Sequence, residues 1–252
     1  VDIPIVSDAK EAITKMNEYV QECSTDKWLN LIKNWKEEHP LKMRPNDLLS
    51  PMDILKEINE QFENSIIVTD VGQHQMLVSQ YAEITEGKQM IMSGGLGTMG
   101  YGLPGGIGAK IGNPDRPVIV ISGDGGVQMN IQELATAVLE ELPVILCIFN
   151  NEYLGMVRQW QTLFYEKHYS ATVLDDGVDY VKLSEAMGAT ARRVKTQEEF
   201  EKAFADALKS KTPFVIDCII DSDDKVWPMV APGKPINESF DEEDYNATQG
   251  GN

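Results

Sequence analysis

Basic residues are scarce in this sequence. The 22 lysines and arginines stand against 40 aspartates and glutamates, which gives a formal net charge of −18 at pH 7. A field of this sign repels phosphate backbones and anionic membrane surfaces. The charge therefore argues against nucleic acids and lipid surfaces as partners of the chain.

Cysteine is rare as well, and long apolar runs are missing. The three cysteines, Cys23, Cys147 and Cys218, are widely spaced and form no C-x-x-C motif, which is typical of free thiols in a reducing, cytoplasmic compartment. No segment approaches the roughly 18–20 apolar residues that a membrane span needs, and no charged-then-apolar signal opens the chain. Because residue 1 is Val rather than Met, we expect a processed or truncated piece of a longer protein.

What the sequence does contain is an alternation of strand-like and helix-like segments. Segments such as 118–122 (VIVIS) and 144–149 (VILCIF) are apolar on both faces, as a parallel sheet between two helix layers requires. The pattern predicts a doubly wound α/β fold, in which ligands bind at the carboxyl ends of the strands. The expected strands are 66–69, 89–92, 118–122, 144–149, 191–194 and 214–220, and the expected helices around them are 51–62, 73–81, 104–111, 131–140, 180–187 and 196–209.

Prolines mark a boundary before this pattern. Pro40, Pro45 and Pro51 fall in a short stretch that cannot be a continuous helix. Before it we expect a strand at 1–6 and helices at 9–20 and 26–37. At the other end, 231–252 is expected to be an acidic, solvated tail.

One glycine-rich loop matches a dinucleotide-binding fingerprint. Residues 95–100 have the pattern G-x-G-x-x-G, follow an expected strand, and are followed by Asp115. In that fingerprint the third glycine lies inside a helix, whereas here the loop must continue until a helix can start at Pro104. Asp115 also lies in an Asn-Pro-Asp-Arg-Pro turn rather than at a strand end. A nicotinamide oxidoreductase is therefore a weak alternative.

Two other loops combine a carboxylate with side-chain amides. Gly123-Asp124-Gly125 and Asn150-Asn151 follow the two most apolar strands. Neighbouring parallel strands bring such loops together, and a carboxylate plus an amide oxygen suit Mg²⁺, which completes its shell with water and phosphate oxygens. Gly125 and Gly126 leave main-chain N–H groups open to a diphosphate at the start of the next helix. The loops predict a Mg²⁺–diphosphate site, with two unrelated tight turns as the alternative.

These loops also resemble a known signature. Gly123-Asp124-Gly125, 24 further residues and then Asn150-Asn151 is similar to the metal-binding motif of thiamine-diphosphate enzymes. The stretches 71–76 (VGQHQM), 93–104 and 155–165 (GMVRQWQTLFY) resemble the catalytic subunit of acetohydroxyacid synthase (acetolactate synthase). The resemblance covers nearly the whole chain.

The resemblance implies a domain organisation and a site. Residues 1–40 would be the end fragment of the family's middle domain, and 41–230 its carboxyl-terminal thiamine-diphosphate-binding domain. Metal ligands would be Asp124 and Asn151 through side chains and Tyr153 through its main-chain carbonyl. The residues implied to contact the cofactor are Val71, Gly72, Gln73, His74, Gly97, Met99, Gly123, Asp124, Gly125, Gly126, Asn151, Tyr153, Leu154, Gly155, Met156 and Val157.

Some of these residues have a more specific implied role. Gly97 would offer its carbonyl to the aminopyrimidine amine, and Met99 would bend the cofactor between its two rings. Met156 would lie over the thiazolium, and Trp160 would shape the pocket for the second substrate. Taken alone, His74 could equally be a structural partner, Met99 a core methionine, and the last two residues part of one apolar helical face.

The implied activity is the joining of pyruvate to a second 2-ketoacid, giving 2-acetolactate or 2-aceto-2-hydroxybutyrate in branched-chain amino acid biosynthesis. In the family, a glutamate from the amino-terminal domain of a neighbouring subunit completes the site, so we expect a homodimer or homotetramer with the cofactor at a subunit interface. FAD binds mainly to the family's middle domain, of which only an end fragment is expected here. The preference for the second 2-ketoacid and the presence of a regulatory subunit stay open.

Two alternatives remain beside this interpretation. The chain could bind Mg²⁺ and thiamine diphosphate without turnover, since the implied site is only half complete. It could also come from another thiamine-diphosphate enzyme, such as a pyruvate oxidase or a glyoxylate carboligase, which shares the metal motif. The stretch around Trp160 favours the acetohydroxyacid synthases.

Overall fold

The computed structural model describes residues 1–249 except 45–46, 62–63, 86, 88 and 175–176, and the chain forms two compact units, 1–41 and 42–252. Pro45 and the expected helix end at Phe62 lie outside the described residues. No helix among the described residues is long and apolar enough to cross a bilayer.

The first unit contains two helices, α1 (Ala9–Asn17) and α2 (Asp26–Glu38). The Asp8 carboxylate caps α1 by accepting a hydrogen bond from the Lys10 N–H at 2.9 Å. In α2, the rings of Trp28 and Trp35 pack edge to face, with their centroids 5.7 Å apart. The strand predicted at 1–6 is wrong: these residues are irregular, because a strand needs a pairing partner and no described segment pairs with them.

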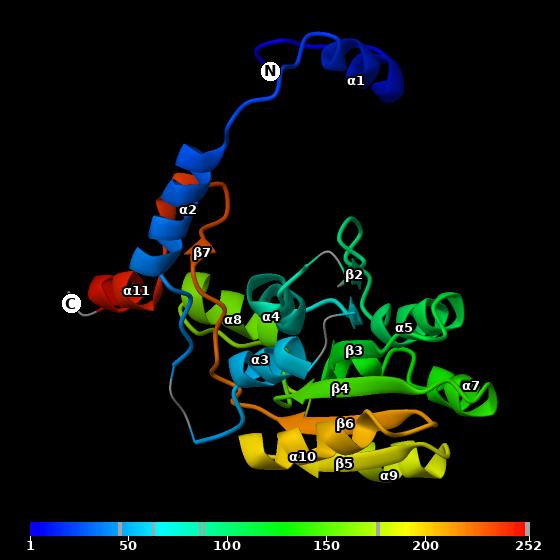
Figure 1. The fold of residues 1–252 in the computed structure, drawn as a ribbon. Coiled ribbons are helices and arrows are strands. Elements are labelled where there is room, and N and C mark those ends of the chain that lie inside the picture. The colour runs from blue at the N-terminus through cyan, green and yellow to red at the C-terminus, as the bar shows by residue number, and fades with distance from the viewer. Residues whose placement is uncertain (45–46, 62–63, 86, 88, 175–176, 250–252) are drawn as a thin grey trace. The chain divides into compact units, whose positions relative to one another are not determined.

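The second unit is built on a sheet of parallel strands, as the apolar segments predicted (Figure 1). In the described residues the order of its six strands is β2-β1-β3-β4-β6-β5. The strands are β1 (Ile66–Thr69), β2 (Gln89–Met92), β3 (Val118–Gly123), β4 (Val144–Asn150), β5 (Thr190–Val194) and β6 (Phe214–Ile219). The doubly wound α/β prediction is confirmed.

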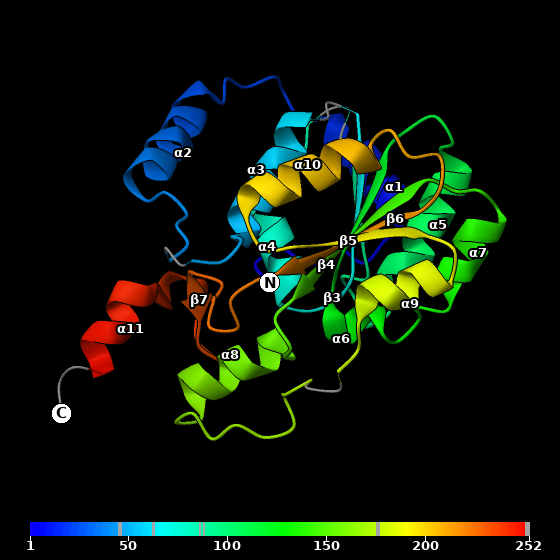
Figure 2. The same ribbon diagram turned by 90° about the horizontal axis from the view of Figure 1, so that it is seen from below.

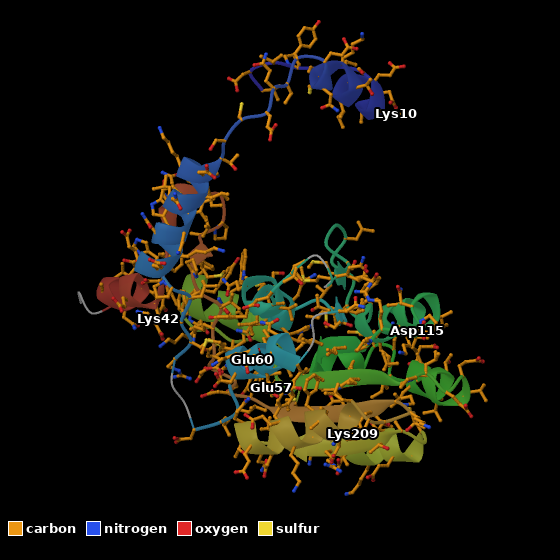
Figure 3. All side chains as sticks on the ribbon, in the orientation of Figure 1. Lys10, Lys42, Glu57, Glu60, Asp115 and Lys209 are labelled. Atoms are coloured by element: carbon orange, nitrogen blue, oxygen red, sulfur yellow. The ribbon has the colours of Figure 1, made fainter. Side chains whose placement is uncertain are left out.

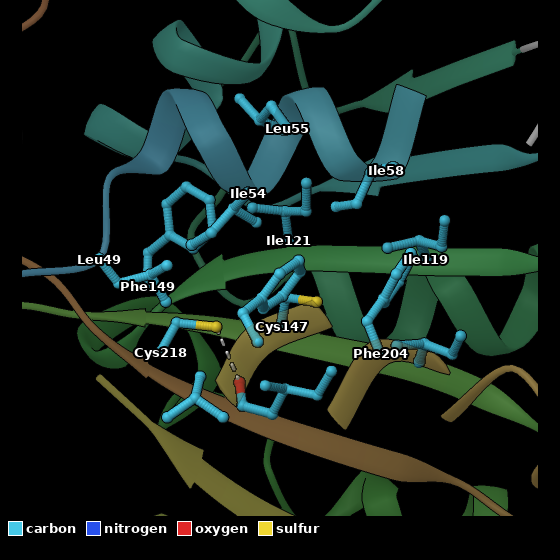
Figure 4. Close-up of a cluster of buried hydrophobic side chains, with 14 of the residues drawn as sticks. Leu49, Ile54, Leu55, Ile58, Ile119, Ile121, Cys147, Phe149, Phe204 and Cys218 are labelled. Atoms are coloured by element: carbon cyan, nitrogen blue, oxygen red, sulfur yellow. Dashed lines mark hydrogen bonds between the residues drawn. The ribbon is translucent and has the colours of Figure 1, made fainter. Parts of the chain in front are cut away.

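Helices cover both faces of this sheet (Figure 2). One layer is α3 (Pro51–Gln61), α4 (Gln73–Tyr81) and α10 (Gln197–Ala207), and the other is α5 (Gly102–Gly112), α7 (Glu133–Leu139) and α9 (Tyr180–Ala186). Figure 4 shows the first layer, where Ile54 and Ile58 of α3 and Phe204 of α10 pack on Ile119 and Cys147 of the sheet. Charged side chains lie on the outer surface, among them the labelled Glu57, Asp115 and Lys209 (Figure 3).

The strand order creates a crevice where ligands bind in this class of fold. From β1 the chain runs outward to β2, and it then returns across β1 to form β3 on the other side. When the connections that follow two neighbouring strands run in opposite directions, a gap forms between them at the carboxyl ends of the two strands. The loops after β1 and β3 therefore border this gap.

Several boundaries differ from the prediction: for example, α1 ends at Asn17 rather than at residue 20, and α7 covers Glu133–Leu139 rather than 131–140. Helix α5 starts at Gly102 rather than at Pro104, because a proline fits in the first turn of a helix, where its missing N–H needs no partner. A short helix, α6 (Asp124–Val127), directly follows β3.

The expected tail contains regular secondary structure, although most of its described residues are exposed, as predicted. Strands β7 (Met229–Val230) and β8 (Ser239–Phe240) form an antiparallel pair, the 3₁₀ helix η1 (Ile236–Glu238) lies between them, and α11 (Glu242–Gln249) follows. Phe240 packs against Phe164 of α8 (Gly155–Phe164) with ring centroids 6.2 Å apart, and the Tyr245 hydroxyl donates to the Thr162 carbonyl at 3.2 Å. These contacts hold the half-buried Phe240 and Tyr245 against α8, while most of the acidic residues around them stay exposed.

Candidate cofactor site

The loops after β1, β2, β3 and β4 line one cavity of about 200 Å³ at the carboxyl edge of the sheet. All of the predicted site residues except Trp160 lie on its wall. Leu77, Phe149 and Ile220 also line it, and sequence reasoning missed them because apolar periodicity marks a residue as buried without saying what it faces.

The Asp124 carboxylate joins the ends of β3 and β4. Its Oδ1 accepts the Gly125 N–H at 2.9 Å, and its Oδ2 accepts the Glu152 N–H at 2.7 Å. The residue is only 2% exposed, and this burial raises the pKa of its carboxyl to about 6. No cationic side chain among the described residues pairs with this carboxylate, and such a desolvated group favours a bound cation.

Asn151 and Tyr153 lie in the same turn as Glu152. The Asn151 Oδ1 accepts the Tyr153 N–H at 3.1 Å. Tyr153 pairs with Val173 in an antiparallel bridge, whose hydrogen bonds use the flanking Glu152 carbonyl and Leu154 N–H, each at 2.8 Å. Because the bridge uses the flanking groups, the N–H and carbonyl of Tyr153 point to the other side, toward the Asn151 side chain. Asp124, Asn151 and Tyr153 thus line the same cavity, and their binding of one metal ion stays a prediction.

His74 ties the loop after β1 to the end of β3. Its Nε2 accepts the Gly123 N–H at 3.3 Å, and burial lowers the pKa of the ring to about 4, although Asp70 acts in the opposite direction. A nitrogen that accepts this hydrogen bond carries no proton, so the ring is neutral at pH 7. His74 lies in the cavity wall, and its predicted contact to a diphosphate stays a prediction.

Gln73 makes equally specific contacts. Its Nε2 donates to the Gln159 Oε1 at 2.9 Å and to the Asp224 carbonyl at 2.7 Å, and Gln159 in turn bonds both the N–H and the carbonyl of Val226. A Cβ on Gly155 would lie 2.5 Å from the Gln73 Oε1, so a larger residue there would have to displace this amide. The side-chain donors of Gln73 are thus engaged within the protein, and its predicted diphosphate contact remains untested.

The loop that carries Gly97 and Met99 is positioned by Asp70. The Asp70 carboxylate accepts the N–H groups of Val71, Gly100 and Gly102 at 2.7, 3.0 and 2.8 Å. The sequence analysis did not predict this role of Asp70. The position of Asp70, at the end of a strand and just before a glycine-containing loop, could have indicated it. Asp115 lies instead in an exposed turn before β3, at the opposite edge of the sheet, so a dinucleotide site is not supported (Figure 3).

Trp160 belongs to a second, more open cavity of about 740 Å³ beside the first. Met156 and Val157 line both cavities, and Trp160 and Phe164 continue the same face of α8 with ring centroids 5.4 Å apart. An apolar wall thus leads from the predicted metal edge to an open pocket. The described residues contain no group of three or more His, Cys, Asp and Glu that could hold a metal, so a site rich in carboxylate or sulfur ligands is not supported there.

Comparison with known proteins agrees with this geometry. The family model described as "Thiamine pyrophosphate enzyme, C-terminal TPP binding domain" matches residues 70–218. The acetolactate synthase large subunit of Cyanidium caldarium is 41% identical over 239 residues, and that of Corynebacterium glutamicum is 40% identical over 246 residues. These alignments cover 92% of this chain but only 40% and 39% of the relatives, so the chain spans about two fifths of their length.

A solved structure supports the fold. The thiamine diphosphate-dependent 4-hydroxybenzoylformate decarboxylase of Rhodococcus jostii RHA1 matches with a TM-score of 0.66 and 25% sequence identity, covering 71% of this chain and 34% of that one.

Proposed function

Because the chain belongs to the thiamine pyrophosphate enzymes through their C-terminal TPP-binding domain, we propose that it supplies the Mg²⁺–diphosphate half of an acetolactate synthase active site. The reaction would join pyruvate to a second 2-ketoacid, giving 2-acetolactate or 2-aceto-2-hydroxybutyrate. The similarity to acetolactate synthase large subunits favours this activity over that of a pyruvate oxidase or a glyoxylate carboligase.

One observation carries the proposal. The hydrogen bond between Asp124 and the Glu152 N–H joins two loops that are 28 residues apart, and it sets a buried carboxylate beside the Asn151 amide and the Tyr153 carbonyl. Hard oxygen ligands from few residues suit Mg²⁺ that also binds phosphate oxygens. The residues present therefore fit the metal and its diphosphate.

The chain's own residues would then divide the work. Asp124, Asn151 and the Tyr153 carbonyl would hold Mg²⁺. Gly97 and Met99 would orient the cofactor, which supplies the electron sink for 2-ketoacid decarboxylation when it is bound. The apolar wall formed by Met156, Val157 and Trp160 would exclude water, and Trp160 would contact the second 2-ketoacid.

We propose further that turnover needs more protein than this chain. The complete enzyme would be a dimer or tetramer with the cofactor between subunits, with amino-terminal domains and FAD. The chain alone would bind Mg²⁺ and thiamine diphosphate without acting on pyruvate. Activity of a preparation shown by intact mass to hold only these residues would contradict this part.

Calorimetric titration with thiamine diphosphate, with and without Mg²⁺, tests the cofactor site. We expect Mg²⁺-dependent binding that Asp124→Ala abolishes and that Asp115→Ala, at an exposed turn, leaves unchanged. Thiamine diphosphate binding that does not depend on Mg²⁺, or that is retained in Asp124→Ala, would contradict the metal assignment. If this chain binds nothing, the same titration on a longer protein that includes the amino-terminal domains decides whether the loops pair as proposed.

A further inference from the structure

A row of hydrogen-bonded polar side chains, centred on the buried Asp217, lies behind the two loops that carry the proposed metal ligands, residues 123–126 and 150–153, here called the metal loops. The Asn150 Nδ2 donates to the Asp217 Oδ1 at 2.9 Å, and the Arg193 Nε donates to the Asp217 Oδ2 at 2.7 Å. Asp217 is fully buried, on the neighbouring strand β6. A buried carboxylate with both oxygens engaged holds its partners in one geometry.

The same row reaches the first metal loop through α9. Arg193 also pairs with Asp179 at 3.1 Å, and Asp179 caps α9 by accepting the Lys182 N–H. The next residue, Tyr180, donates its hydroxyl to the Asp124 carbonyl at 3.2 Å and accepts a hydrogen bond from Gln128 at 2.7 Å. Figure 2 shows α6 and α9 on the same side of the sheet.

On this side the metal loops border an open space as well as packed side chains such as Leu154 and Leu174, which lie close to Gly125. A cavity of about 180 Å³ lies there, lined in part by Asp124, Asn150, Glu152 and Tyr180. Where such a space replaces packed atoms, dispersion contacts are lost. The hydrogen bonds from Tyr180 and Asp217 therefore add to those that the Asp124 carboxylate makes within the loops.

We propose that Asp217, Arg193 and Tyr180 are positioning residues of the Mg²⁺ site, an inference that rests on the proposed function. Asn151 directly follows Asn150, and the Asp124 main chain is held by Tyr180, so this network sets the spacing of the two ligand side chains. The three residues come from β6, β5 and α9, outside the stretches that resemble the family's metal motif.

A matched pair of tyrosine variants tests the role of α9. Tyr180→Phe and Tyr245→Phe each remove one hydroxyl that donates to a main-chain carbonyl at 3.2 Å, but only Tyr180 bonds a metal loop. We expect Tyr180→Phe to raise the Mg²⁺ concentration for half-maximal thiamine diphosphate binding about fivefold, the equivalent of about 1 kcal/mol, with full binding restored at saturating Mg²⁺. Tyr245→Phe should leave it unchanged.

A second pair tests the carboxylate. Asp217→Asn still accepts from Asn150 but turns a donor toward Arg193, so we expect an increase of tenfold or more in the Mg²⁺ requirement. Asp206→Asn, which loses the partner of the neighbouring Arg192 on β5, should cause none. If Asp217→Asn does not fold, the tyrosine pair still decides.

The outcomes separate the two proposals. If the unmodified chain binds thiamine diphosphate with Mg²⁺ and Tyr180→Phe requires no more Mg²⁺ than Tyr245→Phe, the positioning role is overturned and the proposed function stands. An equal rise in the Mg²⁺ requirement of both variants also overturns the positioning role, because the effect then does not depend on contact with a metal loop. If neither the unmodified chain nor the longer protein shows Mg²⁺-dependent binding, the proposed function fails and the positioning role fails with it.

Discussion

Burial of Asp124 makes a stability prediction that does not depend on turnover. Because the folded state raises the pKa of this carboxyl from 3.8 to about 6, the folded protein binds the proton more tightly than the unfolded chain. The associated stability is fully present below pH 3.8 and is lost as the pH rises through about 6. The shift corresponds to about 3 kcal/mol lost by pH 7, in the absence of a metal.

In the unmodified protein, titration of His74 offsets this loss of stability. Burial lowers the pKa of its ring from 6.5 to about 4, so its contribution is present above pH 6.5 and is lost as the pH falls through about 4. Between pH 4 and 6 the two slopes have opposite sign and similar size, about 1.4 kcal/mol per pH unit each. Only a difference between variants separates them.

The assay is urea denaturation of the unmodified chain and Asp124→Asn from pH 4 to 8 with a chelator present. The Asn side chain has one acceptor for the two N–H groups of Gly125 and Glu152. The missing hydrogen bond lowers the free energy of unfolding of the variant by about 1–3 kcal/mol, and this contribution does not change with pH. Titration of His74 is common to both proteins and cancels. The free energy of unfolding of Asp124→Asn, minus that of the unmodified chain, should therefore rise by about 3 kcal/mol from pH 4 to 7 and then stay level.

A difference that stays constant with pH would refute the reasoning, because Asp124 would then titrate alike in the folded and unfolded states. Asp115→Asn, at an exposed turn, serves as the control for removing a carboxylate that lies outside the cavity. Adding Mg²⁺ with thiamine diphosphate should stabilise the unmodified chain and leave Asp124→Asn unaffected.

Two further predictions concern packing and specificity. A Cβ on Gly106 of α5 would clash with the Val120 Cγ2 of β3, so Gly106→Ala should lower the free energy of unfolding by about 1–3 kcal/mol. Combining it with Val120→Ala should cost less than the sum of the two single changes, and strict additivity in urea denaturation would argue against this contact. In the complete enzyme, Trp160→Ala should relax the preference between second 2-ketoacids more than it lowers the overall rate, as measured by competition between pyruvate and 2-ketobutyrate, and a uniform loss of rate would count against a role in the pocket.

The arrangement of the sheet was predictable because its signals are local. Segments such as 118–122 and 144–149 are apolar on both faces, and that pattern alone requires two covering helix layers. The site loops were predictable for a related reason, since glycine, Asp and Asn clusters directly after such strands must meet at one edge of a parallel sheet. The errors fell where a partner was needed. Residues 1–6 have a strand-like composition, but no described strand pairs with them. The acidic segment 239–249 forms regular structure because its aromatic residues contact α8.

By itself, the sequence determined the fold class and which strand-end loops border the cavity, because periodicity and residue type act over a few positions. Only the tertiary structure decided how those loops are held. Asp70 reaches the N–H groups of residues 100 and 102, Gln73 bonds Gln159, and Asp217 fixes Asn150. Each of these contacts joins positions at least 30 residues apart, and each depends on strand register and side-chain orientation, which no spacing along the chain encodes.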